Sequence, residues 1–245
     1  MAALTALGAS PGELRVHSAS AYRVGADPDE LAALLHHLAP YTGLPRVLQA
    51  TRALDGLLPA GCPEHPVQLT DHRTTVVDRP AQGTPAGPPL VLVHALGLDR
   101  RMWRDTIAAL PTDRRVLAYD LRGHGTAGEA PQVRDLQHFA QDLDDLLDRL
   151  AVDTAHLVGL SLGGAIAQVY ALTRPERIGE LTLVATVTTP QPAFLQRGAA
   201  AQAGGKAGVL AATLTRWFTP EALAVNGWPV LRYARDQVSC ADPDT

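Results

Sequence analysis

Cysteine is nearly absent from this 245-residue chain, which holds only Cys62 and Cys240. These two residues lie far apart in unrelated contexts, so the sequence predicts neither a disulfide framework nor a cysteine-based metal site. Lysine is scarcer still, with Lys206 as its one example, and arginine supplies the rest of the Lys/Arg positive charge. We expect no bound metal and no cofactor.

Excess positive charge and long hydrophobic runs are missing as well. The net charge of −4 at pH 7 argues against a nucleic acid or an anionic membrane surface as a partner. No apolar run approaches the length of a bilayer span, and Met1–Ser10 lacks the basic and apolar regions of a secretory signal. We expect a soluble, cytoplasmic protein without membrane contact; the sequence indicates no oligomeric state.

The sequence predicts a helical segment at residues 1–58. Asp27 is the predicted N-cap of its clearest helix, Pro28 occupies the first helical position, and Glu30 has capping-box spacing from Asp27. The predicted helices begin near Pro11, Pro28 and Pro45, with a break at Pro40–Gly43 and the third helix ending near Leu58.

Residues 59–66 have the composition of a linker, and strand and helix patterns alternate in the domain predicted at 67–245. Short apolar runs followed by amphipathic helices predict a doubly wound α/β sheet, preceded by a hairpin and followed by a partial helical cap after Pro190. The predicted strands are Val67–Thr70, Thr74–Asp78, Leu90–His94, Arg115–Tyr119, Ala155–Val158 and Leu181–Val187. The predicted helices are Arg101–Leu110, Asp135–Leu150 and Ala165–Thr173.

The segment His156–Gly164 carries the strongest chemical signal. It contains Gly159-Leu160-Ser161-Leu162-Gly163, a G-x-S-x-G pattern between a predicted strand and a predicted helix. In that context the pattern forms a sharp turn that exposes the serine hydroxyl above the sheet. Ser161 is therefore the candidate nucleophile, and an ordinary glycine-rich turn is the structural alternative.

A serine that attacks a carbonyl needs hydrogen-bond donors for the oxyanion that forms. We expect one donor to be the backbone N–H of Leu162, at the start of the helix after Ser161. The loop after Leu90–His94 is expected to supply the second, from the backbone N–H of Leu96. Both roles belong to the backbone, so a plain turn is the alternative for this loop.

Four motifs together resemble the α/β-hydrolase superfamily, and within it most of all the 3-oxoadipate enol-lactonases. They are His94–Trp103, Leu117–Gly125, His156–Gly164 and Leu181–Thr186. The resemblance implies a hydrolase of aromatic catabolism, in the β-ketoadipate pathway, that opens a carboxylated lactone or ester by acylation of Ser161. Such a substrate requires a cation, for which Arg122 and Arg216 are candidates and surface arginine is the alternative.

Three short pieces of the helical segment resemble the second half of the all-helical carboxymuconolactone decarboxylase family. They are residues 13–17, 25–31 and 41–45. The two families catalyse consecutive steps and occur fused, and here the decarboxylase-like part comes first. No C-x-x-C pair occurs, which argues against the related peroxidase chemistry. His17 matches a family histidine, and we expect a structural role for it.

The triad of α/β-hydrolases follows the order serine, acid, histidine. No histidine follows Ser161 in this sequence, and the later aspartates are Asp236, Asp242 and Asp244. We expect His94 and His124 to shape loops and Asp120 to fix a turn.

We accordingly expect a chain truncated before the strands that carry the acid and the histidine, with weak or no activity. A general esterase or haloperoxidase-like hydrolase of the same fold is an alternative. A non-catalytic remnant that binds a partner is another.

Overall fold

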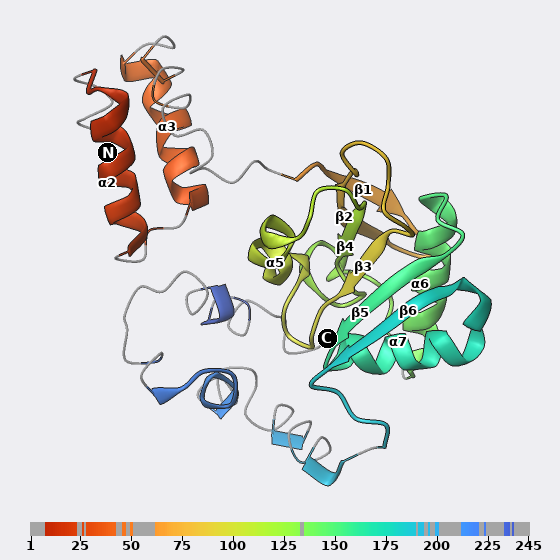
Figure 1. The fold of residues 1–245 in the computed structure, drawn as a ribbon. Helices are drawn as coiled ribbons and strands as arrows, with labels where there is room; N and C mark the ends of the chain where they lie inside the picture. The colour runs from red at the N-terminus through yellow and green to blue at the C-terminus, as the bar shows by residue number, and fades with distance from the viewer. Residues whose placement is uncertain are drawn as a thin grey trace. The chain divides into compact units, whose positions relative to one another are not determined.

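The computed structural model describes residues 8–23, 26, 28–42, 46–47, 50, 62–132, 135–189, 191–193, 196, 199–200, 212–220, 223, 233–235 and 237. These residues divide into two compact units, one within 1–61 and 214–233, the other within 62–213 and 234–245 (Figure 1). None of the helices in the described ranges is long and apolar enough to cross a bilayer.

The first unit contains α2 (Pro11–Arg23) and α3 (Pro28–Thr42). Its core consists of Leu14, Leu31, Leu35, Val47 and Ala50. The last two belong to the predicted third helix, most of which lies outside the described residues, as does the predicted N-cap Asp27.

Two features of these helices differ from the sequence prediction. Ser10 and Glu13 form a capping box before α2: the Ser10 backbone N–H donates to the Glu13 carboxylate at 2.8 Å, and the Glu13 N–H donates back to the Ser10 hydroxyl at 3.3 Å. The break predicted from Pro40 was wrong, because α3 continues to Thr42. Proline fixes φ near the helical value, and the Thr42 hydroxyl donates to the Leu38 carbonyl at 3.0 Å across this last turn.

The second unit is built on a six-stranded sheet in the order β1-β2-β4-β3-β5-β6. β1 (Glu64–Gln68) and β2 (Arg73–Arg79) form the predicted antiparallel hairpin, and β2 also pairs antiparallel with β4. The parallel strands are β3 (Leu90–Val93), β4 (Val116–Tyr119), β5 (Ala155–Leu160) and β6 (Ile178–Val184). The helical elements are η1 (Arg100–Trp103), α5 (Arg104–Ala109), η2 (Gly125–Ala127), α6 (Leu136–Arg149), α7 (Leu162–Thr173) and η3 (Pro175–Arg177).

Successive strand residues point into two different cores, as the period of a strand requires. On one face Val91, Val93, Leu117, Tyr119 and Leu157 pack with side chains of α6 and α7. On the other face Leu92, Val116 and Ala118 pack with Trp103 and Ile107 of η1 and α5. Helices therefore cover both faces of the parallel strands (Figure 1), which confirms the predicted doubly wound α/β sheet.

Several element boundaries were predicted wrongly. β1 begins at Glu64, inside the expected linker. The single helix predicted at Arg101–Leu110 is divided into η1 and α5, and the Asp99 carboxylate caps η1 by accepting from the Arg101 N–H. β6 ends at Val184 because Ala185 leaves the strand with a φ of 46°. Most of the cap predicted after Pro190 lies outside the described residues.

Candidate active site

Ser161 lies at the tip of the turn between β5 and α7. Its φ of 53° is rare for a residue with a side chain. The Ser161 N–H donates to the Val184 carbonyl at 2.9 Å, and its own carbonyl accepts from the Ala165 N–H at 3.0 Å, which pins both of its peptide groups. The side chain is exposed and makes no capping bond to α7, so the hydroxyl is presented outward.

Three glycines allow this turn to close. A Cβ on Gly163 would collide with the Val93 carbonyl oxygen, and one on Gly159 would collide with the carbonyl of Gly163. A Cβ on Gly164 would lie 2.7 Å from the side chain of Thr186. The start of α7 therefore packs directly on the end of β3 and on the chain after β6.

The loop after β3 forms a tight turn beside Ser161. The Leu98 N–H donates to the Ala95 carbonyl at 3.2 Å, and Gly97 supplies the positive φ, 75°, that the turn needs at this position. Leu96 lies between them with an exposed side chain. Val93 pairs with Gly159 across adjacent strands, so the loops that carry Leu96 and Leu162 emerge side by side. The chain order reverses at this edge of the sheet, where ligands bind in doubly wound folds.

His94 is fully buried at the start of this loop. Its Nε2 accepts from the Leu121 N–H at 2.9 Å, so Nδ1 carries the proton that it donates to the Ala95 carbonyl, also at 2.9 Å. Burial, together with the ring of His124 at 5.2 Å, lowers the pKa of His94 to about 4. Both ring nitrogens are engaged, which agrees with a loop-shaping role and makes His94 unsuitable as the base for Ser161.

Asp120 fixes the turn after β4, as expected from the sequence. Its buried carboxylate accepts from the Arg100 N–H at 2.9 Å, the Arg100 guanidinium at 2.7 Å and the Thr126 N–H and hydroxyl, both at 2.8 Å. Arg100 also donates to Glu64 at 2.6 Å. Arg100 could not be identified from the sequence, because no local pattern links it to a carboxylate twenty residues away.

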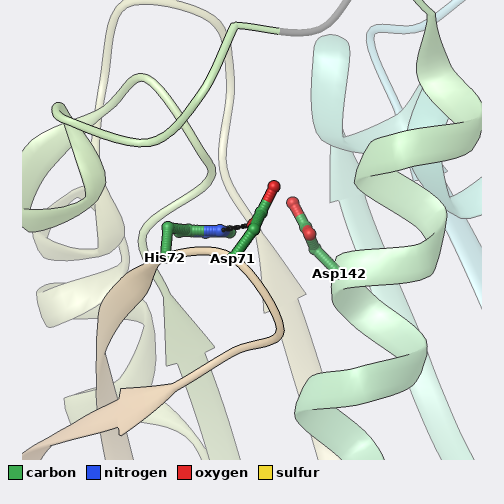
Figure 2. Close-up of side chains that lie close together, drawn as sticks. All are labelled: Asp71, His72 and Asp142. Carbon is green, nitrogen blue, oxygen red and sulfur yellow. Dashed lines mark hydrogen bonds and ion pairs between the residues drawn. The ribbon is translucent and has the colours of Figure 1, made fainter.

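Asp71, His72 and Asp142 form the acidic cluster of Figure 2, in which the β1–β2 loop faces α6. Arg122 supplies its cation: the guanidinium donates to both Asp142 oxygens at 2.7 and 2.6 Å and approaches Asp71 at 3.2 Å. The hydrogen bond with His72 and then Arg122 lower the pKa of Asp71. Arg122 therefore ties both carboxylates into an ion-pair network, in which Asp142 is buried and Asp71 is exposed. These carboxylates already engage the Arg122 guanidinium, which disfavours Arg122 as the cation for a substrate carboxylate, and its burial rules out a surface arginine at this position. Arg216, the other candidate, is exposed.

Comparison with known proteins gives matches for both parts of the chain. Residues 88–222 match the family described as alpha/beta hydrolase fold, and residues 1–56 match the carboxymuconolactone decarboxylase family. The 3-oxoadipate enol-lactonase 1 of Acinetobacter baylyi is 31% identical over 157 residues, which cover 63% of this chain and 59% of that protein. A pimeloyl-[acyl-carrier protein] methyl ester esterase of Aeromonas hydrophila is 36% identical over 112 residues, covering 45% and 41%. The chain thus spans less than two thirds of these curated relatives.

Solved structures give the same fold. The enol-lactonase from Burkholderia xenovorans superposes with a TM-score of 0.66 at 29% identity, covering 74% of this chain and 69% of that one. A hydrolase from Pseudomonas aeruginosa gives a TM-score of 0.65 at 33% identity, covering 74% and 68%.

Proposed function

The chain belongs to the α/β-hydrolase family, and on that premise we propose that it is a serine hydrolase of the 3-oxoadipate enol-lactonase type. The observation that carries the proposal is the geometry of Ser161, whose exposed hydroxyl lies on a strained turn between β5 and α7. The similarity to enol-lactonases in both sequence and structure supports a carboxylated lactone as the substrate class.

In the proposed reaction the Ser161 hydroxyl oxygen attacks the lactone carbonyl carbon. The oxyanion that forms accepts hydrogen bonds from the backbone N–H groups of Leu162 and Leu96. Collapse of this intermediate breaks the ring C–O bond and leaves an acyl group on Ser161, and the proton that was taken from Ser161 passes to the released oxygen. Water then attacks the acyl carbon, which releases the acid and restores the serine.

A base must take the proton of Ser161, and all nine histidines of the sequence precede that residue. His94 is engaged at both nitrogens. We therefore propose that turnover by the chain as printed is weak, since loss of triad members costs on the order of 10⁴–10⁶ in rate.

An assay with an external base tests this proposal. Hydrolysis of a carboxylated enol-lactone, a neutral lactone and a p-nitrophenyl ester is measured with and without imidazole, for the wild type and Ser161→Ala. We expect imidazole to accelerate a Ser161-dependent reaction, most of all with the carboxylated lactone. Equal rates for the two proteins would contradict a serine mechanism.

A general esterase is the second candidate, favoured by the similarity to a methyl ester esterase. The same substrate panel separates the two, because a general esterase hydrolyses the simple ester faster than either lactone. Absence of any reaction above that of Ser161→Ala favours the third candidate, a non-catalytic protein that binds a partner.

For the N-terminal part we propose a decarboxylase-like module at residues 1–58, joined to the hydrolase domain by a linker that ends before β1 begins at Glu64. Its match to the decarboxylase family supports the assignment. Release of CO₂ from carboxymuconolactone by the purified chain would show that this module is catalytically active.

A further inference from the structure

We propose that His94 is a positioning residue for the reaction, because it fixes the plane of the Ala95–Leu96 peptide and so sets the direction of the Leu96 N–H. The inference rests on the proposed function, which makes that N–H an oxyanion donor. It concerns a side chain that does not touch the substrate.

The peptide between Ala95 and Leu96 is held from its carbonyl side. The Ala95 oxygen accepts from the His94 ring at 2.9 Å and from the Leu98 N–H at 3.2 Å. In a trans peptide the C=O and N–H groups point in opposite directions, and the described residues contain no cis bond. With the carbonyl turned toward the buried imidazole, the Leu96 N–H is directed away from it.

The Leu96 N–H has no competing role in the turn. Leu96 is the second residue of the turn Ala95–Leu98, where the closing hydrogen bond uses the N–H of the fourth residue. Within the described residues, no protein group accepts from the Leu96 N–H. This donor is therefore available to an oxygen atom of a ligand.

The imidazole itself is held in place from the other side. Its Nε2 accepts from the Leu121 N–H at 2.9 Å, and the His124 ring packs against it edge-on. Arg100, further along the same loop, is bound through both its backbone and its guanidinium to Asp120. The loop is thus fixed at both ends to the turn after β4, which gives the preorganisation that an oxyanion donor requires.

Protonation of His94 would break this arrangement, because a proton on Nε2 would face the Leu121 N–H. The titratable groups that act on the ring are His124, which disfavours the charge, and Asp120 and Asp99, which favour it. Burial outweighs both carboxylates, so the ring is neutral at pH 7.

Two substitutions separate positioning from mere space filling. In His94→Asn the side-chain amide can still donate to the Ala95 carbonyl, whereas His94→Ala removes the donor. His138→Ala is the control, since His138 is an exposed histidine on α6. All variants are first checked for folding by circular dichroism and urea unfolding.

With imidazole present, we expect His94→Ala to lower kcat about 10²- to 10³-fold with little change in KM, the effect of losing one oxyanion donor. His94→Asn should recover part of the loss, and His138→Ala should match the wild type. If Ser161-dependent turnover persists and His94→Ala lowers kcat no more than His138→Ala does, the proposal is overturned.

A second readout does not depend on turnover. In the ¹⁵N-labelled full chain, we expect the Leu96 amide resonance to move strongly in His94→Ala, less in His94→Asn and not at all in His138→Ala. A Leu96 resonance unmoved by His94→Ala overturns the inference. If Ser161-dependent turnover is absent, the proposed function fails separately, and this resonance alone decides whether His94 fixes the peptide.

Discussion

Gly163 occupies a position in the turn at Ser161 where a Cβ would collide with the Val93 carbonyl oxygen. We predict that Gly163→Ala lowers the free energy of unfolding by about 1–3 kcal/mol, because the start of α7 must move away from β3. Gly128→Ala is the matched control: its φ is −59° and its Cβ would make an ordinary 3.5 Å contact. Urea unfolding followed by circular dichroism measures both, and equal effects would contradict the packing argument.

Asp120 holds two loops together from a fully buried position. We predict that Asp120→Asn costs about 3–5 kcal/mol of unfolding free energy, because it leaves the Arg100 guanidinium facing a neutral group in the interior. Asp148→Asn removes a similar ion pair, with Arg177, from a side chain that is 66% exposed, and should cost about 1 kcal/mol or less. A cost for Asp120→Asn that is no larger than this would show that its network is not structural.

The lowered pKa of His94 makes the free energy of unfolding depend on pH. Its folded pKa of about 4 lies below the ordinary value of 6.5, so between these values the unfolded chain binds more protons at this position. The contribution of His94 to stability is therefore complete above pH 6.5 and is lost as the pH falls toward 4.

We expect the stability difference between the wild type and His94→Asn to shrink over this window. Urea unfolding at a series of pH values measures it. A difference that stays constant from pH 7 to pH 4 would mean that the buried ring is not held neutral.

At the scale of elements, the sequence pattern was sufficient to predict six strands, the hairpin and a doubly wound α/β sheet, whereas the order of the strands comes from the structure. The ends of the strands could not be predicted, because partners elsewhere in the chain determine them. β6 pairs with β5 from Ile178 onward and stops at Ala185, which local hydrophobicity does not reveal. The helix predicted at Arg101–Leu110 failed for a local reason, since the adjacent Asp99 caps a 3₁₀ turn that precedes α5.

The residues of the candidate site could be predicted from the sequence, but the contacts that hold them could not. Ser161, Leu162 and Leu96 follow from a local motif and remain proposals in their chemical roles. The contacts of His94 and of Arg100 were not predictable in detail, because they join the loop after β3 to the turn after β4. A motif identifies the segment that carries the chemistry, whereas the groups that hold this segment in place come from other strands.

β6 lies at an edge of the described sheet and exposes apolar side chains. It pairs only with β5 within the described residues, and Leu181, Leu183 and Val184 on it are 36–41% exposed. An exposed apolar strand at a sheet edge favours association with other strands. We predict that Leu183→Lys reduces concentration-dependent association in sedimentation velocity experiments.

Leu172→Lys provides the control, because Leu172 is 84% exposed but lies on helix α7. Equal reductions by both substitutions would assign the effect to added charge rather than to the strand edge.

At the scale of the whole molecule, residues 1–56 and 88–222 match two different families, and the proposed hydrolase chemistry lies in the unit that holds the sheet. There the loop after β3 and the turn after β5 meet where the strand order reverses. The turn that carries Ser161 is formed there, and His94 in the neighbouring loop is engaged at both ring nitrogens. We therefore propose a formed nucleophile turn with weak proton transfer from Ser161.

Site-resolved labelling with a fluorophosphonate tests this central claim most directly. The full chain is incubated with the reagent, and peptide mass spectrometry locates the phosphonylated residue in the wild type and in Ser161→Ala. We predict labelling that is slow, confined to Ser161, accelerated by imidazole and lost in Ser161→Ala. Labelling spread over other serines, or an equal extent in Ser161→Ala, would contradict the assignment of Ser161 as the nucleophile.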